Sequence, residues 1–208
     1  MPHPDDEAYS SAGTLALAAD RGAAVAVLCV TQGELGGDAR ERGEELRASC
    51  DAIGAACLPS LGWPDAGVAD VASSSAVTAV MALRDAMQGW WPDVVLGLGA
   101  DGVYGHSDHL ALHGLLRAAI LGPPAESSSW SRPALYEAVF PHRHFHPVWR
   151  ALRRQRFAWV PSGWTPERFG SPPHPDDVVV PLAAVASRKR AAIAAHASQL
   201  RGAAPEDF

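Results

Sequence analysis

Two short segments of the chain carry histidine and carboxylate side chains close enough in sequence to bind a metal ion. They are Pro2-His3-Pro4-Asp5-Asp6 near the N-terminus and Gly105-His106-Ser107-Asp108-His109 in the middle of the chain. Catalytic zinc sites commonly use three protein ligands and keep a fourth position for water. His3, Asp6 and His109 would supply such a set, and iron(II) fits the same ligands. The two segments therefore predict one divalent-metal site, with Zn²⁺ as the first choice.

This set of residues would suit the hydrolysis of an amide. A catalytic zinc lowers the pKa of its bound water to about 7. Asp5 neighbours a predicted ligand but projects differently, so it can accept the proton of that water. His106 lies three residues before His109 and could polarise the substrate carbonyl or protonate the leaving amine, while Asp108 could orient an imidazole. We expect Asp5 to be needed for turnover and to be dispensable for metal binding.

Alternating strand and helix patterns must position these residues. Valine-rich apolar runs predict buried strands, and amphipathic segments with capping residues and terminal glycines predict helices. The predicted strands are Ala24–Thr31, Ala55–Leu61, Asp93–Leu98, Leu135–Phe140 and Val178–Val180. The predicted helices cover residues 8–21, 39–53, 74–87, 108–121 and 183–200. The alternation predicts an α/β fold: a Rossmann-like, doubly wound, mainly parallel sheet in a single domain, residues 1–208.

The predicted topology brings the two segments together. Ligands of open α/β sheets bind at the carboxyl ends of the strands, where the following helices begin. The first segment directly precedes a helix, and the second lies between the strand Asp93–Leu98 and a helix. Both therefore belong to the same edge of the sheet.

A second copy of the first motif, Pro173-His174-Pro175-Asp176-Asp177, precedes a predicted strand instead. If that strand is parallel, its entry lies on the opposite edge of the sheet. We therefore interpret this copy as a polar loop without a catalytic role.

Composition sets the broad class of the protein. The chain has 208 residues, 48% hydrophobic and 19% charged, with a net charge of −6, which suits a globular domain and argues against a nucleic-acid partner. Its three cysteines include no CxxC pair, so we expect a reducing compartment. No apolar run reaches the roughly 18 residues of a membrane span. These features predict a cytoplasmic protein without a membrane partner, and they are compatible with a homo-oligomer.

Six short motifs follow one another along most of the chain. They are HPDDE (3–7), TxGE (31–34), RxxEL (42–46), LGxxD (61–65), YGHSDH (104–109) and KRAAIAAHASQ (189–199). In this order the motifs resemble those of the LmbE/PIG-L family of zinc-dependent N-acetylglucosaminyl deacetylases. The family often has HPDH where this chain has HSDH. The stretch YGH is similar to enzymes of mycothiol metabolism, both the inositol-linked deacetylase and the S-conjugate amidase.

The resemblance implies roles for individual residues. It gives His3, Asp6 and His109 as zinc ligands, Asp5 as general base and His106 as the electrostatic or acid residue. It further implies that Arg42 and Asp65 contact sugar hydroxyls and that Glu34 and Tyr104 line the active site. The second PHPDD matches no catalytic position of the family.

The implied activity is removal of an acetyl group from an N-acetylglucosamine-type conjugate, a small amino-sugar substrate. Two alternatives stay open: an amidase acting on mycothiol S-conjugates, and a metal-binding module without activity. Family members carry an apolar strand before HPDDE, whereas here only Met1 and Pro2 precede it. We expect a functional chain that starts upstream.

Overall fold

The computed structural model describes residues 1–123, 131–142, 146 and 170–200, which form a mixed α/β fold with parallel strands. β1 (Ala26–Val27) pairs with β2 (Ala56–Cys57), and β3 (Val94–Leu98) pairs with β4 (Ala134–Ala138). Both pairs are parallel, as the alternating pattern predicts. Within the described residues they form two separate two-stranded sheets, so the coarse α/β prediction is confirmed, whereas the single doubly wound sheet stays a prediction.

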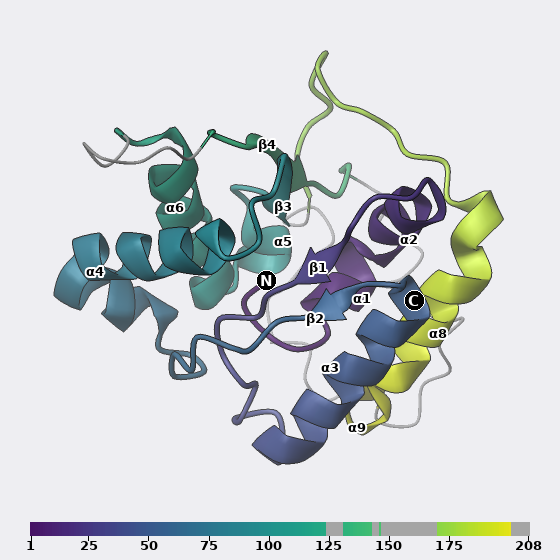
Figure 1. Ribbon diagram of the computed structural model, residues 1–208, viewed down its shortest axis with the longest axis horizontal. Coiled ribbons are helices and arrows are strands. Elements are labelled where there is room, and N and C mark those ends of the chain that lie inside the picture. Colours follow the sequence, from purple (N-terminus) through teal and green to yellow (C-terminus); the bar gives the residue numbers. More distant parts are fainter. Residues whose placement is uncertain (124–130, 143–145, 147–169, 201–208) are drawn as a thin grey trace.

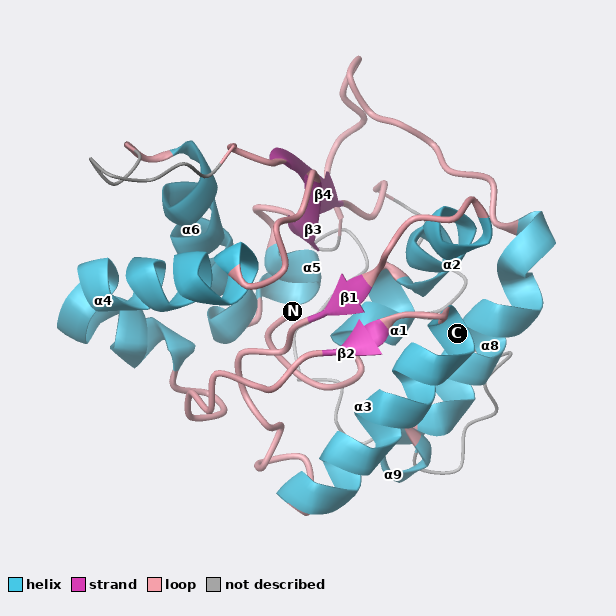
Figure 2. Cartoon of the chain, in the orientation of Figure 1, coloured by secondary structure: helices cyan, strands magenta, loops and turns pink. Residues whose placement is uncertain are grey.

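Helices lie beside both strand pairs (Figures 1 and 2). The N-terminal half contains α1 (Asp6–Ser10), α2 (Ala12–Asp20), α3 (Ala39–Ile53) and α4 (Val68–Gln88). The rest contains α5 (Gly102–Gly105), α6 (Ser107–Leu121), the 3-10 turn Ala183–Val185, α8 (Ala186–Ala195) and α9 (Ala197–Leu200). None of the described helices is both long and apolar enough to cross a membrane.

The helices pack in two groups, one beside each strand pair. α4 packs against α6 next to β3 and β4, on the left of Figure 1, and α3 packs against α8 next to β1 and β2, on the right. The first group encloses a core of residues such as Leu83, Leu112 and Ile120. The second encloses Ile53 and Ile193 among others. The candidate site lies between these groups, where the starts of α1 and α6 meet.

The N-terminal residues run beside the chain that follows β1. Val30 and Thr31 donate backbone hydrogen bonds to the carbonyls of Met1 and Pro2, at 2.9 and 3.0 Å. The Thr31 hydroxyl donates to the Pro2 carbonyl as well, at 3.0 Å. These parallel contacts fix the backbone directly before His3. The threonine of the TxGE motif therefore helps to position the first histidine.

Three of the predicted helices differ from the observed ones. The helix expected over residues 8–21 is split at Ser11, where φ is −128° and ψ is −17°. α4 begins earlier than predicted and is kinked at Ser75, whose hydroxyl accepts a hydrogen bond from the Thr78 N–H, so the predicted serine cap sits inside a longer helix. The helix expected over residues 183–200 breaks at His196.

The predicted strand Val178–Val180 is wrong. These residues have no regular secondary structure, and their exposed fractions are 73%, 86% and 37%. An apolar run becomes a strand only where a neighbouring strand accepts its backbone hydrogen bonds and its side chains are buried. Neither condition holds for this segment in the described structure.

Candidate metal centre and active site

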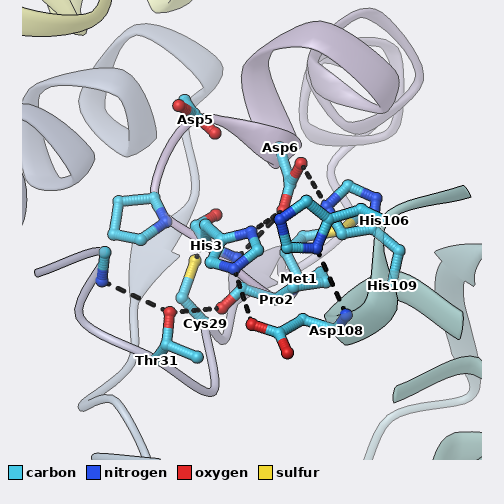
Figure 3. A network of polar contacts seen from close by, with 12 residues as sticks. Met1, Pro2, His3, Asp5, Asp6, Cys29, Thr31, His106, Asp108 and His109 are labelled. Atoms are coloured by element: carbon cyan, nitrogen blue, oxygen red, sulfur yellow. Dashed lines mark hydrogen bonds and ion pairs between the residues drawn. The ribbon is translucent and has the colours of Figure 1, made fainter. Parts of the chain in front are cut away.

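His3 lies at the centre of the candidate site, with its two ring nitrogens facing different carboxylates (Figure 3). Its Nδ1 is 3.3 Å from Asp6 Oδ2, while its Nε2 is 3.0 Å from Asp108 Oδ2 and 3.1 Å from Asp65 Oδ1. Asp108 is fully buried, and its oxygens also accept hydrogen bonds from the N–H groups of Ala66 and Val68. Asp108 therefore holds His3 and the start of α4 at the same time.

His109 approaches the same carboxylate as His3 from the other side. Its Nε2 lies 3.3 Å from Asp6 Oδ1, and its Nδ1 is 3.1 Å from the carbonyl of Gly102. Nε2 is buried and makes no hydrogen bond with any described residue. Because the Gly102 carbonyl accepts a hydrogen bond from Nδ1–H, the lone pair of the neutral ring is on Nε2, directed toward Asp6.

The arrangement fits a divalent cation. The rings of His3 and His109 have centroids 5.4 Å apart, and Asp6 places one oxygen toward each ring. A buried lone pair without a donor is costly unless something binds it, and a cation would do so. His106 is a further candidate, since ligand nitrogens of His3, His106 and His109 lie within 4.8 Å of one another.

The same spacing holds for His3, Asp65 and Asp108, which form a second group of potential ligand atoms. The carboxylate of Asp108 already accepts hydrogen bonds from two backbone N–H groups, so few of its lone pairs are available to bind a metal ion. We therefore regard the imidazole group with Asp6 as the better metal site. The exact ligand set stays a proposal.

His106 caps the N-terminus of α6. Its Nδ1 accepts a hydrogen bond from the Asp108 N–H at 3.2 Å. The neutral ring must then carry its proton on Nε2, which makes that nitrogen a donor. Tyr104 lies beside it, with ring centroids 5.7 Å from His106 and 5.2 Å from His109. Between Gly102 and Tyr104 the backbone is strained, since Val103 has φ of 66°, a value that β-branched residues rarely adopt.

Asp5 is held apart from the imidazoles. Figure 3 shows Asp6 turned toward the rings, with the side chain of Asp5 away from them. Asp5 Oδ2 accepts a hydrogen bond from Arg42 Nη2 at 3.1 Å. Arg42 is 3% exposed, and its guanidinium also donates to the carbonyls of Pro4 and Gly33. The structure therefore places Arg42 on the proposed base, where the family resemblance implies a sugar contact.

Asp65 and Glu34 link two loops at the edge of the site. Asp65 accepts a hydrogen bond from the Leu35 N–H at 3.0 Å, and Glu34 Oε1 accepts one from the Asp65 N–H at 2.8 Å. The other Asp65 oxygen faces His3. Both residues therefore lie beside His3 and its carboxylate partners, and the sugar contact that the resemblance implies for Asp65 stays a prediction.

Burial and neighbouring charges shift the pKa values of the site. Burial lowers the pKa of His3, but hydrogen bonds and charges of Asp6, Asp108 and Asp65 outweigh it and raise the value to about 9. Burial and the charge of Asp6 raise the pKa of Asp5 to about 7, against the opposing effect of Arg42. A carboxyl group with such a pKa can accept a proton near neutral pH.

The pKa values of the other two imidazoles move in the opposite direction. Burial lowers the pKa of both His106 and His109, and the positive charge of His3 adds to this effect. Both rings are therefore mostly neutral at pH 7, which is the form that a metal ligand requires. Burial raises the pKa of Tyr104, which keeps its phenol protonated.

The second PHPDD repeats the local turn of the first but not its surroundings. The His174 N–H donates to Asp177 Oδ2 at 2.7 Å, just as the His3 N–H donates to Asp6 Oδ2 at 2.9 Å. The side chains of His174 and Asp176 are 68% and 91% exposed. No second histidine segment meets them among the described residues.

Sequence reasoning left two buried residues near Asp5 without a role. Glu7 and His196 are both fully buried and joined by a hydrogen bond of 2.7 Å. Glu7 belongs to the motif HPDDE, and His196 belongs to the motif KRAAIAAHASQ. The sequence therefore showed that a carboxylate and a histidine occur inside these motifs. It did not show that the two side chains pair across 189 residues.

Comparison with known proteins identifies relatives of this chain. Residues 1–120 match the family model described as PIG-L: GlcNAc-PI de-N-acetylase. A 1D-myo-inositol 2-acetamido-2-deoxy-alpha-D-glucopyranoside deacetylase of Gordonia bronchialis is 31% identical over 95% of this chain and 82% of its own length. The protein of the same name from Nocardia farcinica is 32% identical over 95% of this chain and 78% of its own. The crystal structure of the conserved protein TT1542 from Thermus thermophilus superimposes with a TM-score of 0.67 and 26% identity, covering 97% of this chain and 78% of that one.

Proposed function

The chain belongs to the PIG-L family of GlcNAc-PI de-N-acetylases, and we propose that it is a metal-dependent hydrolase that removes the acetyl group from an N-acetylglucosamine-type conjugate. The curated relatives are named as deacetylases of an inositol-linked acetamido sugar. One observation of the site supports the proposal most strongly. His3 and His109 converge on the two oxygens of Asp6, and a buried nitrogen of His109 has no hydrogen-bond donor among the described residues.

The proposed metal ligands are His3 through Nδ1, Asp6, and His109 through Nε2. Asp108 accepts a hydrogen bond from His3 Nε2–H and the carbonyl of Gly102 accepts one from His109 Nδ1–H, so each ring would present its other nitrogen to the metal. Because the pKa of His3 is raised to about 9, metal binding would release the proton from His3 Nδ1. A bound zinc ion would supply a Lewis acid that activates water and polarises the acetyl carbonyl. Iron(II) would fit the same donors, and the identity of the metal is part of the proposal.

The remaining residues divide the proton transfers. Asp5, with a pKa of about 7, accepts the proton that the attacking water gives up. His106 carries its proton on Nε2 and donates a hydrogen bond to the oxygen of the acetyl group as negative charge develops there. The amide C–N bond then breaks, the amino sugar leaves with the proton taken from the water, and acetate is the second product.

The experiment that tests this proposal measures metal content and amine release on the same samples. The purified chain should bind about one equivalent of zinc or iron(II), and it should release amine from N-acetylglucosaminyl-inositol or a related conjugate. Chelation should abolish the release, and the added metal should restore it. Metal binding with no turnover on any amide would refute the function and favour a module without activity. Turnover only on a mycothiol S-conjugate would favour the amidase alternative.

Two adjacent variants separate the proposed roles. Asp5→Asn should lower kcat by about 10²–10⁴ and retain the metal, because it removes only the base. Asp6→Asn should lose the metal. Asp70→Asn, an exposed acidic residue in the first turn of α4, is the control and should change neither. Loss of metal in Asp5→Asn would contradict this division.

A further inference from the structure

A buried carboxyl group holds the backbone of the proposed base from behind. Glu7, in α1, is fully buried, and its Oε2 accepts a hydrogen bond from the N–H of Asp5 at 3.0 Å. Its Oε1 accepts two more, from the Ser49 hydroxyl at 2.6 Å and from His196 Nε2 at 2.7 Å. Three segments far apart in the sequence therefore meet at one side chain: α1, α3 and the break between α8 and α9.

The backbone conformation of Asp5 requires a stabilising hydrogen bond. Its φ is 119°, a value that a residue other than glycine adopts only with strain, which costs on the order of 1–3 kcal/mol. Its carbonyl starts α1 by accepting hydrogen bonds from Ala8 and Tyr9 at 2.9 and 3.2 Å. Its N–H points instead to Glu7. This bond fixes the peptide plane, and with it the direction in which the Asp5 side chain leaves the backbone.

Glu7 can serve as this acceptor only if its own position is fixed. A buried carboxyl group is costly unless hydrogen bonds satisfy it. Ser49 and His196 provide those bonds, and both are themselves fully buried. His196 Nδ1 makes no hydrogen bond with any described residue, so the contribution of this ring to the network is the single donor at Nε2.

We propose that His196 is a positioning residue for the general base, acting through Glu7, and that Ser49 supports the same carboxyl group. The inference rests on the proposed function, because it assigns His196 to the geometry of the Asp5 step. This role of His196 also accounts for the helix break at residue 196. Because α8 ends there, the imidazole turns toward Glu7. The C-terminal segment thereby becomes part of the catalytic apparatus without touching metal or substrate.

Two variants of the holoenzyme test the single-donor argument. His196→Leu removes the donor and should lower kcat by about 10–100-fold, because a displacement of about 1 Å at a catalytic group can cost that much. KM and metal content should stay unchanged. His196→Gln supplies one N–H donor and should restore most of the rate. The matched control is His174→Leu, whose side chain is 68% exposed, and it should behave as the parent protein.

A double variant distinguishes positioning from general structural damage. When Asp5 is already replaced by Ala, His196→Leu should cost little further rate, because the group it positions is gone. Full additivity of the two losses would overturn the inference. So would a His196→Gln variant as slow as His196→Leu.

One measurement does not depend on activity. Hydrogen exchange of the Asp5 amide, followed by NMR, should be at least about tenfold faster in His196→Leu than in the parent and near normal in His196→Gln. Unchanged exchange would overturn the inference even if the parent protein proves inactive on every amide. A parent protein that hydrolyses no amide while the exchange follows this pattern would refute the proposed function alone.

Discussion

Replacing Asp108 should weaken the fold and the metal site together, and the structure allows the size of each effect to be worked out. Asp108 Oδ1 accepts the N–H of Val68, while Oδ2 accepts the N–H of Ala66 and faces His3 Nε2. In Asp108→Asn only one oxygen remains. The amide would keep this oxygen on the Oδ2 side, where it serves two partners, and would leave the N–H of Val68 without an acceptor.

An unsatisfied buried N–H costs about 1–3 kcal/mol. For a chain of this length each kcal/mol lowers Tm by roughly 2–4 °C, so Asp108→Asn should melt about 2–12 °C below the parent protein. Asp108→Ala leaves both N–H groups unsatisfied and should cost about twice as much. It also releases His3, so zinc affinity should fall by about 10–100-fold, the usual effect of losing the partner of a metal-bound histidine.

Thermal unfolding followed by circular dichroism would give the stability loss, and competition with a chromophoric chelator would give the zinc affinity. Asp70→Asn, in the exposed first turn of α4, is the matched control and should leave both unchanged. An Asp108→Ala variant with parental Tm would refute the capping role. A destabilised variant with parental zinc affinity would refute the role of Asp108 in orienting His3.

Three further predictions concern the surroundings of the base and the repeated motif. Arg42 lowers the pKa of Asp5, and Asp5 must be ionised to accept a proton. Arg42→Met should therefore move the acidic limb of the kcat/KM profile to higher pH, whereas the control Arg40→Met, at an exposed residue, should not. An acidic limb that stays in place in Arg42→Met would contradict this prediction. Gly36→Ala should shift the limb the same way, since the added methyl group would displace the Arg42 guanidinium; a rate profile identical to the parent's would count against that contact. Alanine at every polar side chain of Pro173–Asp177 should change neither metal content nor rate, and a lost metal equivalent would show that the second copy binds one.

Local patterns predicted the parts of the fold that depend on local physics. The helix over residues 39–53 has the predicted ends because Asp38 accepts hydrogen bonds from two first-turn N–H groups and Gly54 takes the left-handed conformation that ends a helix. The strand predicted over residues 93–98 is observed from Val94 to Leu98. Val178–Val180 is also apolar and rich in valine, but it lacks a neighbouring strand in the described structure, which no local pattern can reveal.

The candidate site was predictable at the level of its segments and less so at the level of contacts. Because helix starts share one edge of the fold, we expected His3 and His109 to meet, and their rings lie 5.4 Å apart. The sequence also indicated that Asp108 could orient an imidazole, but not that this imidazole is His3. It did not indicate that Asp65 also faces His3, or that Arg42 faces Asp5. Such pairings depend on how loops pack across the site. A resemblance of motifs predicts the roles that residues have in the family, but not the contacts that they make in this chain.

Two buried carboxyl groups connect the stability of this fold with its proposed chemistry. Asp108 caps α4 and orients a predicted metal ligand, and Glu7 joins α1, α3 and the C-terminal segment while it holds the backbone of Asp5. Removing either carboxyl group would therefore reduce stability and activity together, and a loss of rate alone could not identify its cause. The partners of these groups are more informative, because a change such as His196→Gln removes a ring but keeps one donor. A rate that follows the donor and not Tm would assign the effect to geometry at the base.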